Sequence, residues 1–245
     1  SEMCIRDRKL FVKEKLNGFD VMRVWVYATP NKNFITRLLF YFSFTFFGII
    51  YGILNWKNFD AIYVTSPPLF VGLIGIFLKK LFPKTKFIFE VRDLWPDVAV
   101  ALNELNNKKF IKLSQHLERK CYTLANKIVA VTKYFKDEIV KKGITSTKID
   151  VVRNGTDIDS WEKSYNKKFV DILGYKDKFI VIYAGNLGVA QGLETIIYAA
   201  NEVKNQKDIL FLFVGDGPIK KQLEQLKNSL KLNNVIFLPA APSKE

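Results

Sequence analysis

The stretch KFIFEVRDLWPD, residues 86–97, is the part of this sequence that most clearly indicates both a strand and a functional site. Its first apolar residues are typical of a buried strand. The apolar pattern then stops, and Glu90, Arg92 and Asp93 lie at the carboxyl end of that strand. Pro96 cannot continue a strand ladder. Ligands of an open parallel sheet bind beyond the carboxyl ends of its strands, so these charged groups are well placed for chemistry. The alternative is a buried Arg–Asp pair that only ties the loop down.

Length and composition are those of a globular protein. The chain has 245 residues, of which 49% are hydrophobic and 25% charged, enough for one large domain or two modest ones. Two cysteines build no disulfide framework, which favours a reduced cytosolic setting. The single histidine, His116, excludes a site made of several histidines.

Positive charge is concentrated in the first part of the chain. Residues 1–153 hold 26 Lys and Arg against 13 Asp and Glu, a balance of +13, whereas residues 154–245 hold 12 against 11, a balance of +1. Such a split indicates two units with different partners. The lysines are scattered and form no Arg-rich block, so we expect an anionic membrane surface as partner and no nucleic acid.

Strands and helices alternate along the chain, which predicts an α/β fold with parallel sheets. We expect an N-terminal Rossmann-like domain over residues 1–159, in which 1–8 look extraneous, a polar linker over 160–178, and the start of a second domain over 179–245. The second domain would hold three strands, and the first lacks a glycine-rich first loop. We therefore expect both domains to be incomplete, with the sequence truncated at each end.

Nineteen uncharged residues, 38–56, have two interpretations. Their length is that of a transmembrane helix. The strand that follows over 60–68, the apolar helix over 69–82 and the strand at 86–91 instead form a βαβ rhythm. We favour a buried helix of the α/β domain that touches lipid with one face.

Two glycine loops follow consecutive strands of the second domain. Gly185, Gly188 and Gly192 lie in AGNLGVAQG, and Gly215 and Gly217 lie in GDG. Glycines at such positions let backbone amides approach an anion at a helix N-terminus. Together the loops predict a cleft for a nucleotide diphosphate, the alternative being two tight turns.

These motifs together resemble the retaining glycosyltransferases of family 4, which have the GT-B fold. More narrowly, the sequence is similar to the fucosamine-transferase-like branch, which adds amino or deoxy sugars to lipid-linked precursors of bacterial surface polysaccharides. Six segments carry the resemblance in the family's order: TSPP (65–68), FEVRDLWPD (89–97), RNGTD (153–157), YAGNLGVAQGLE (183–194), FVGDGPIKKQLE (213–224) and NVIFLP (234–239).

The resemblance implies a role for each group of residues. Arg92 would stabilise developing negative charge, and Asp93 would orient the acceptor or the arginine. The implied donor-binding residues are Gly185, Asn186, Gly188, Gln191, Gly215, Asp216 and Gly217. The implied acceptor or cleft residues are Ser66, Pro67, Glu90 and Asn154.

Two features depart from the family pattern. Asn186 and Gln191 stand where many relatives carry an arginine and a lysine on the diphosphate, which leaves phosphate binding to amides and to residues elsewhere. The family's Glu-x7-Glu element would lie beyond Glu245, so we expect this chain to be inactive by itself.

The implied reaction is transfer of a sugar from a nucleotide-sugar donor, expected to be UDP-linked, to a lipid-linked or polysaccharide acceptor with retention. Amides and helix dipoles would stabilise the leaving phosphate, so we expect no cofactor and no metal. Asp157 and Asp159 form a D-x-D spacing, but they open the polar linker and we interpret them as turn and surface residues.

A membrane-facing first half implies a cytoplasmic protein, peripheral on the inner face of the cell membrane. The alternative function is a non-catalytic, membrane-associated nucleotide-binding module.

Overall fold

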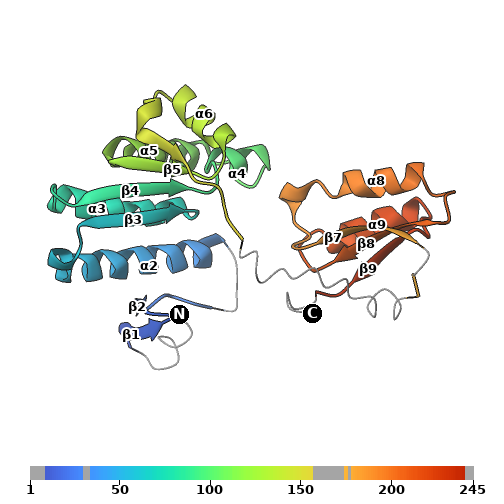
Figure 1. Cartoon of the computed structure of the whole chain (residues 1–245), viewed down its shortest axis with the longest axis horizontal. Helices are drawn as coiled ribbons and strands as arrows, with labels where there is room; N and C mark the ends of the chain where they lie inside the picture. Colours follow the sequence, from blue (N-terminus) through green and yellow to red (C-terminus); the bar gives the residue numbers. More distant parts are fainter. Residues whose placement is uncertain (1–8, 30–33, 157–173, 176–177, 241–245) are drawn as a thin grey trace. The chain divides into compact units, whose positions relative to one another are not determined.

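The protein divides into two compact units, 1–156 and 157–245. The computed structural model describes residues 9–29, 34–156, 174–175 and 178–240 (Figure 1). The linker predicted over 160–178 therefore lies largely outside the described residues, as do residues 1–8. Each unit is built on its own parallel sheet, which confirms the predicted α/β class with two Rossmann-like domains.

The first unit contains a four-stranded parallel sheet in the order β3-β4-β5-β6. Its strands are β3 (Ala61–Ser66), β4 (Lys86–Val91), β5 (Lys127–Ala130) and β6 (Ile149–Val151). Thr65 pairs with Glu90 in the register of β3 and β4. The strand predicted from the stretch KFIFEV is thus an inner strand of this sheet.

Helices α3 (Gly72–Leu81), α5 (Lys108–Leu124) and α6 (Lys133–Lys141) pack on the sheet. Short helical turns join them: η1 (Trp56–Asn58), η2 (Leu69–Val71), α4 (Asp97–Ala101) and η3 (Ser146–Lys148). The core beneath them includes Phe87, Phe89, Ile128, Ile139 and Ile149, all at most 1% exposed. Fully burying one such side chain stabilises the fold by about 1.5–3 kcal/mol.

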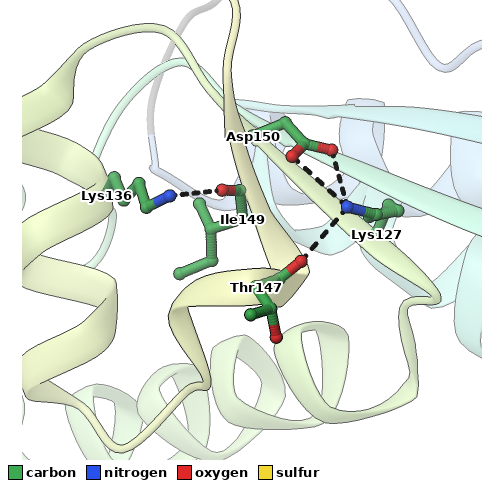
Figure 2. Close-up of polar contacts among 5 residues, drawn as sticks. All are labelled: Lys127, Lys136, Thr147, Ile149 and Asp150. Carbon is green, nitrogen blue, oxygen red and sulfur yellow. Dashed lines mark hydrogen bonds and ion pairs between the residues drawn. The ribbon is translucent and has the colours of Figure 1, made fainter.

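Lysines from neighbouring elements hold the edge strand β6 in place (Figure 2). The ammonium group of Lys127 lies 3.0 Å from the Asp150 carboxylate and donates a hydrogen bond to the Thr147 carbonyl at 3.1 Å. Lys136 of α6 donates to the Ile149 carbonyl at 2.8 Å. Some of the lysines of this unit therefore stabilise its fold.

The apolar alternation in GFDVMRVWVYA predicts one strand over residues 18–28, as the first strand of the α/β alternation. The structure has a shorter strand there, β2 (Phe19–Val24), which pairs with β1 (Phe11–Leu16) in a separate antiparallel hairpin. Asn17 and Gly18 both have positive φ, 50° and 85°, at its turn. Asn-Gly is the pair that a two-residue hairpin turn favours, because both central residues need positive φ.

Helix α2 (Phe34–Leu54) covers the uncharged run and lies against α3. A side chain at Gly48 would meet the Ile74 side chain, and one at Gly52 would overlap that of Leu78, so glycines allow the two helices to approach closely. Phe47 packs on the hairpin, 6.1 Å from Phe11 between ring centroids.

Helix α2 is far less buried than expected, and contact of one of its faces with lipid stays a prediction. The described residues contain one helix long and apolar enough to cross a membrane, Ile35–Leu54, with a mean hydropathy of 1.6 and 11% of its residues buried. Positions spaced like one helical face remain exposed because neither α3 nor the hairpin covers them. These residues, called the α2 stripe below, are Ile35, Leu39, Phe42, Phe46 and Ile53.

The second unit repeats the pattern in a three-stranded parallel sheet, β7-β8-β9. Its strands are β7 (Phe179–Ala184), β8 (Ile209–Val214) and β9 (Val235–Leu238). Between them lie η4 (Val189–Gln191), α8 (Glu194–Glu202) and α9 (Lys220–Ser229). The core of this unit includes Leu187, Ile197, Phe213, Leu223 and Val235, all fully buried.

Candidate functional site

The carboxyl ends of the first unit's strands meet at one edge, as predicted. The Arg92 amide donates a hydrogen bond to the Ser66 carbonyl at 2.9 Å, which joins the turns after β3 and β4. The Val152 amide bonds to the Ala130 carbonyl at 3.0 Å, which joins the turns after β5 and β6. Ser66, Arg92 and Asp93 therefore lie together, and Asn154 follows β6 at the same edge.

Arg92 is exposed and Asp93 is half-buried. Neither forms an ion pair within the described ranges, so the buried Arg–Asp pair considered as an alternative is absent there. Ser66 is 2% exposed, whereas the side chain of Pro67 reaches solvent. Pro67, Arg92 and Asn154 are thus exposed at this edge, and Ser66 contributes its backbone.

Tyr63 is a member of this neighbourhood that the sequence analysis missed. Partial burial raises the pKa of its phenol, the Glu90 carboxylate raises it further, and Arg92 opposes both. The register that pairs Thr65 with Glu90 places Tyr63, Glu90 and Arg92 on one face of the sheet. The alternation in AIYVTS, compared with that in FIFEVR, is the signal that could have found it.

The turn after Arg92 is anchored by apolar contacts. Leu94 and Pro96 are buried, and the Trp95 ring lies 5.8 Å from Phe70 and 6.4 Å from Phe110 between centroids. A cavity of about 440 Å³ opens beside these rings. Its lining consists of Arg37, Leu38, Tyr41, Phe70, Trp95, Ala99, Glu104, Leu105 and Phe110.

The two glycine loops of the second unit contact each other backbone to backbone. The Gly185 amide donates to the Val214 carbonyl and the Leu187 amide to the Asp216 carbonyl, both at 2.9 Å. A Cβ on Gly215 would overlap the Gly185 carbonyl oxygen. A Cβ on Gly217 would likewise overlap the Leu187 carbonyl oxygen.

Glycine is therefore required at 215 and 217 by loop packing alone, independent of any ligand. The tight-turn alternative accounts for the choice of glycine there, and donor binding by Gly185, Gly215 and Gly217 remains a prediction. The Asp216 carboxylate accepts a hydrogen bond from the Gly217 amide at 2.8 Å, which occupies one of the amides the prediction assigned to phosphate.

The side chains of Asn186 and Gln191 converge on Gly188. A Cβ at Gly188 would lie 2.7 Å from Asn186 Nδ2 and 2.6 Å from Gln191 Oε1. The Tyr183 hydroxyl donates to the Asn186 carbonyl at 2.8 Å and fixes the loop, a contact the sequence analysis did not foresee. Both amide side chains are exposed, so they present neutral donors and acceptors at the carboxyl end of β7.

Within the described residues, no group of three His, Cys, Asp or Glu side chains could hold a metal ion. Asp157 and Asp159 lie outside the described residues.

Glycosyltransferase family models match both parts of the chain. The family model Glycosyltransferase Family 4 matches residues 6–160, and the model Glycosyl transferases group 1 matches residues 165–245. WcaI of Escherichia coli, named as a glycosyl transferase of colanic acid biosynthesis, is 25% identical over 93% of this chain and 57% of its own. WbjE of Pseudomonas aeruginosa, named as a glycosyltransferase, is 27% identical over 55% of this chain and 34% of its own.

Solved structures share the fold. HepE of Anabaena, crystallised with UDP, has a TM-score of 0.64 and 20% identity over 79% of this chain and 51% of its own. Sucrose-phosphate synthase of Thermosynechococcus elongatus has a TM-score of 0.69 and 15% identity over 96% of this chain and 58% of its own. The chain thus spans little more than half the length of these proteins.

Proposed function

This chain belongs to Glycosyltransferase Family 4, and from that premise we propose that the protein transfers a sugar from a nucleotide-sugar donor to a lipid-linked or polysaccharide acceptor in bacterial surface-polysaccharide synthesis. The observation that carries the proposal is the placement of the motifs. In each unit the motif residues follow parallel strands at their carboxyl ends, where ligands of such sheets bind.

The second unit would bind the donor. HepE has been crystallised with UDP-glucose, which supports a UDP-linked donor for this fold. Amides of the loop around Gly188 and the side chains of Asn186 and Gln191 would meet the diphosphate. An amino or deoxy sugar, as in the fucosamine-transferase-like branch, is the donor sugar we propose.

The first unit would bind the acceptor and supply the reacting groups. Arg92, exposed beside Ser66 and Pro67, would stabilise the charge that develops on the leaving phosphate. Asp93 would orient the acceptor hydroxyl, with Glu90 and Asn154 bordering the cleft. Transfer would proceed on the front face of the sugar with retention, and with amides and helix dipoles in place of a metal.

We also propose a peripheral location on the inner face of the cell membrane. The exposed α2 stripe would enter the interface, and the net charge of +13 in residues 1–153 would attract anionic lipid. A lipid-linked acceptor would then be available at the same surface.

The test uses the protein encoded by the complete gene, a panel of UDP-sugars and a sugar linked to a prenyl diphosphate. A sugar-extended lipid product, with the donor's anomeric configuration in its NMR spectrum, is the expected result. Release of inverted product would overturn retention. Tight UDP binding without transfer to any acceptor would instead support a non-catalytic, membrane-associated nucleotide-binding module.

A further inference from the structure

A partly buried ion network joins three helices behind the turn that carries Arg92 and Asp93. The ammonium group of Lys142, at the end of α6, lies 2.7 Å from Asp97 Oδ2 and 2.5 Å from Glu118 Oε1. The Tyr122 hydroxyl donates a hydrogen bond to the same Glu118 oxygen at 2.9 Å. Asp97 begins α4, while Glu118 and Tyr122 lie on α5.

The members of the network differ in exposure. The Glu118 side chain is 5% exposed, that of Lys142 29% and that of Asp97 46%. A cavity of about 270 Å³ opens over them, also lined by Gln115, Arg119 and Ile144. Lys142 and Glu118 therefore form the buried pair, and Asp97 is the partner that reaches it from the surface.

Asp97 also ends the turn that begins at Arg92. The Arg92 amide bonds to Ser66, and Trp95 packs on Phe70 and Phe110. The Val98 amide donates to the Leu94 carbonyl at 3.0 Å, so α4 grows directly from this turn. Among the described contacts of residues 92–97, the Asp97–Lys142 pair is the one ion pair.

We propose that Asp97 and Lys142 are positioning residues: their ion pair holds the turn so that Arg92 and Asp93 keep a fixed place at the carboxyl edge of the sheet. The inference rests on the proposed function, because it assigns a purpose to the placement of Arg92 and Asp93. Glu118 anchors Lys142. Its buried carboxylate binds the same ammonium group and so prevents Lys142 from moving into solvent together with Asp97.

Substitutions in this network separate a positioning role from a purely structural one, because they affect folding to different degrees. Removing Lys142 would leave the buried Glu118 carboxylate without its ion-pair partner, and such losses destabilise proteins strongly. Removing Asp97 leaves the Lys142–Glu118 pair intact, so the fold should hold while the turn loosens. Asp97 is therefore the informative position, and Asp97→Asn the variant that separates positioning from folding.

The experiment compares the full chain with Asp97→Asn, Asp97→Glu and the control Lys141→Met. Lys141 neighbours Lys142 and also forms an ion pair, with Glu138 at 2.7 Å, but that pair lies on the surface. Amide hydrogen exchange at Arg92, Val98 and Val100 reports the turn directly and requires no substrate. Turnover of the complete gene product reports the consequence for chemistry.

Asp97→Asn is expected to raise exchange at the three amides about tenfold and to lower kcat by about 10- to 100-fold with KM for the donor unchanged, as for a small misplacement of reacting groups. Asp97→Glu should restore most of both, and Lys141→Met should match the wild type. Unchanged exchange in Asp97→Asn would overturn the proposal whatever the activity. If no protein shows transfer, the exchange result still decides whether the pair holds the turn, while the proposed function fails separately.

Discussion

At the scale of single residues, Arg92 combines accessibility with a fixed backbone. Its amide is tied to Ser66 at 2.9 Å, while its side chain is exposed and forms no ion pair in the described part of the chain. A charge held in this way can meet a phosphate without first breaking an internal contact. The residue is therefore the sharpest single test of the site.

Arg92→Ala in the complete gene product should lower turnover by at least roughly 100-fold, the scale of losing one well-placed charge stabiliser. The thermal midpoint should stay near that of the wild type, because the side chain packs against little. Lys86→Ala, at the other end of the same strand, is the matched control. Near-normal turnover of a folded Arg92→Ala protein would remove Arg92 from the catalytic set.

Gly217→Ala should destabilise the protein by about 1–3 kcal/mol, the usual cost of forcing extra atoms into a filled space. The added Cβ would overlap the Leu187 carbonyl oxygen, and neither loop can move without breaking their shared hydrogen bonds. Thermal denaturation measures the effect. Gly155→Ala is the control, since nothing lies within 4 Å of its Cβ position. Equal midpoints for the two variants would contradict the close loop contact.

Glu118 should make stability depend on pH. Burial raises the pKa of its carboxyl, although hydrogen bonding and charge from Lys142 and a hydrogen bond from Tyr122 lower it. A folded-state pKa above the unfolded value of about 4.3 means that this group's contribution is complete below that pH. It is lost as the pH rises through the folded-state pKa.

Urea unfolding of wild type and Glu118→Gln between pH 4 and 8 measures this linkage. The free energy of unfolding of the wild type should fall relative to Glu118→Gln as the pH rises. Glu138→Gln controls for the change in net charge. A difference of the opposite sign would mean that Lys142 outweighs burial and keeps the Glu118 carboxylate favoured.

At the scale of elements, α2 has no counterpart among the described residues of the second unit. One side packs on α3 through Gly48 and Gly52, and another on the hairpin through Phe47. The remaining face is the α2 stripe, in which Phe46 is 59% exposed and Ile35 66% exposed. A stripe of this kind, beside a strongly basic unit, is suited to the membrane interface.

Phe46→Gln should weaken binding to anionic vesicles about tenfold, because burying a phenylalanine is worth about 1.5–3 kcal/mol. High salt should release much of the wild type, since screening removes the lysine contribution. Vesicle sedimentation measures both effects. Tyr198→Gln, a similarly exposed ring in the second unit, is the control. Protein that salt and carbonate leave in place, and that only detergent extracts, would show that α2 spans the bilayer.

The elements differ in how well sequence could predict them. Strands β4, β7 and β8 were predictable because apolar runs bounded by polar turns specify buried strands. The hairpin was not predicted, although Asn17-Gly18 is a hairpin turn signal, because apolar alternation alone does not say which strand β2 pairs with. The extent to which α2 is exposed could not be predicted, since composition does not say how many of its faces find a neighbour.

At the scale of the whole molecule, the charge split does not mean that every lysine of the first unit is available to a partner. Several lysines of the first unit hold the fold, among them Lys79, Lys127, Lys136 and Lys142. The remaining basic side chains are those available to an anionic surface. Net charge alone therefore overstates the electrostatic attraction of this unit.

Part of the candidate site could be predicted from the sequence, and part could not. Its residue types and their strand ends could be predicted from motif order, because parallel strands place their loops at one edge. Contacts between distant segments could not, and these include Tyr63 beside Glu90 and Asp97 on Lys142. Such pairings depend on strand register and helix packing, which a single sequence does not specify.

Exhaustive chelation should leave the turnover of the complete gene product unchanged. Amides at the ends of β7 and β8, together with Arg92, would provide the stabilisation that a divalent cation supplies in other transferases. The assay measures transfer before chelation, after chelation and after Mn²⁺ is restored. Activity that vanishes and returns with the metal would overturn the metal-free mechanism and turn attention to Asp157 and Asp159.

The backbone contact between the two glycine loops has a consequence for protein engineering. Because Gly215 and Gly217 lie directly against the carbonyls of Gly185 and Leu187, neither loop can be lengthened or reshaped without its partner. Asn186 and Gln191 carry exposed side chains on that shared frame, and exchanging them leaves the backbone contact between the loops in place. A library meant to alter binding of the donor's diphosphate should therefore randomise these two positions together and leave the glycines untouched.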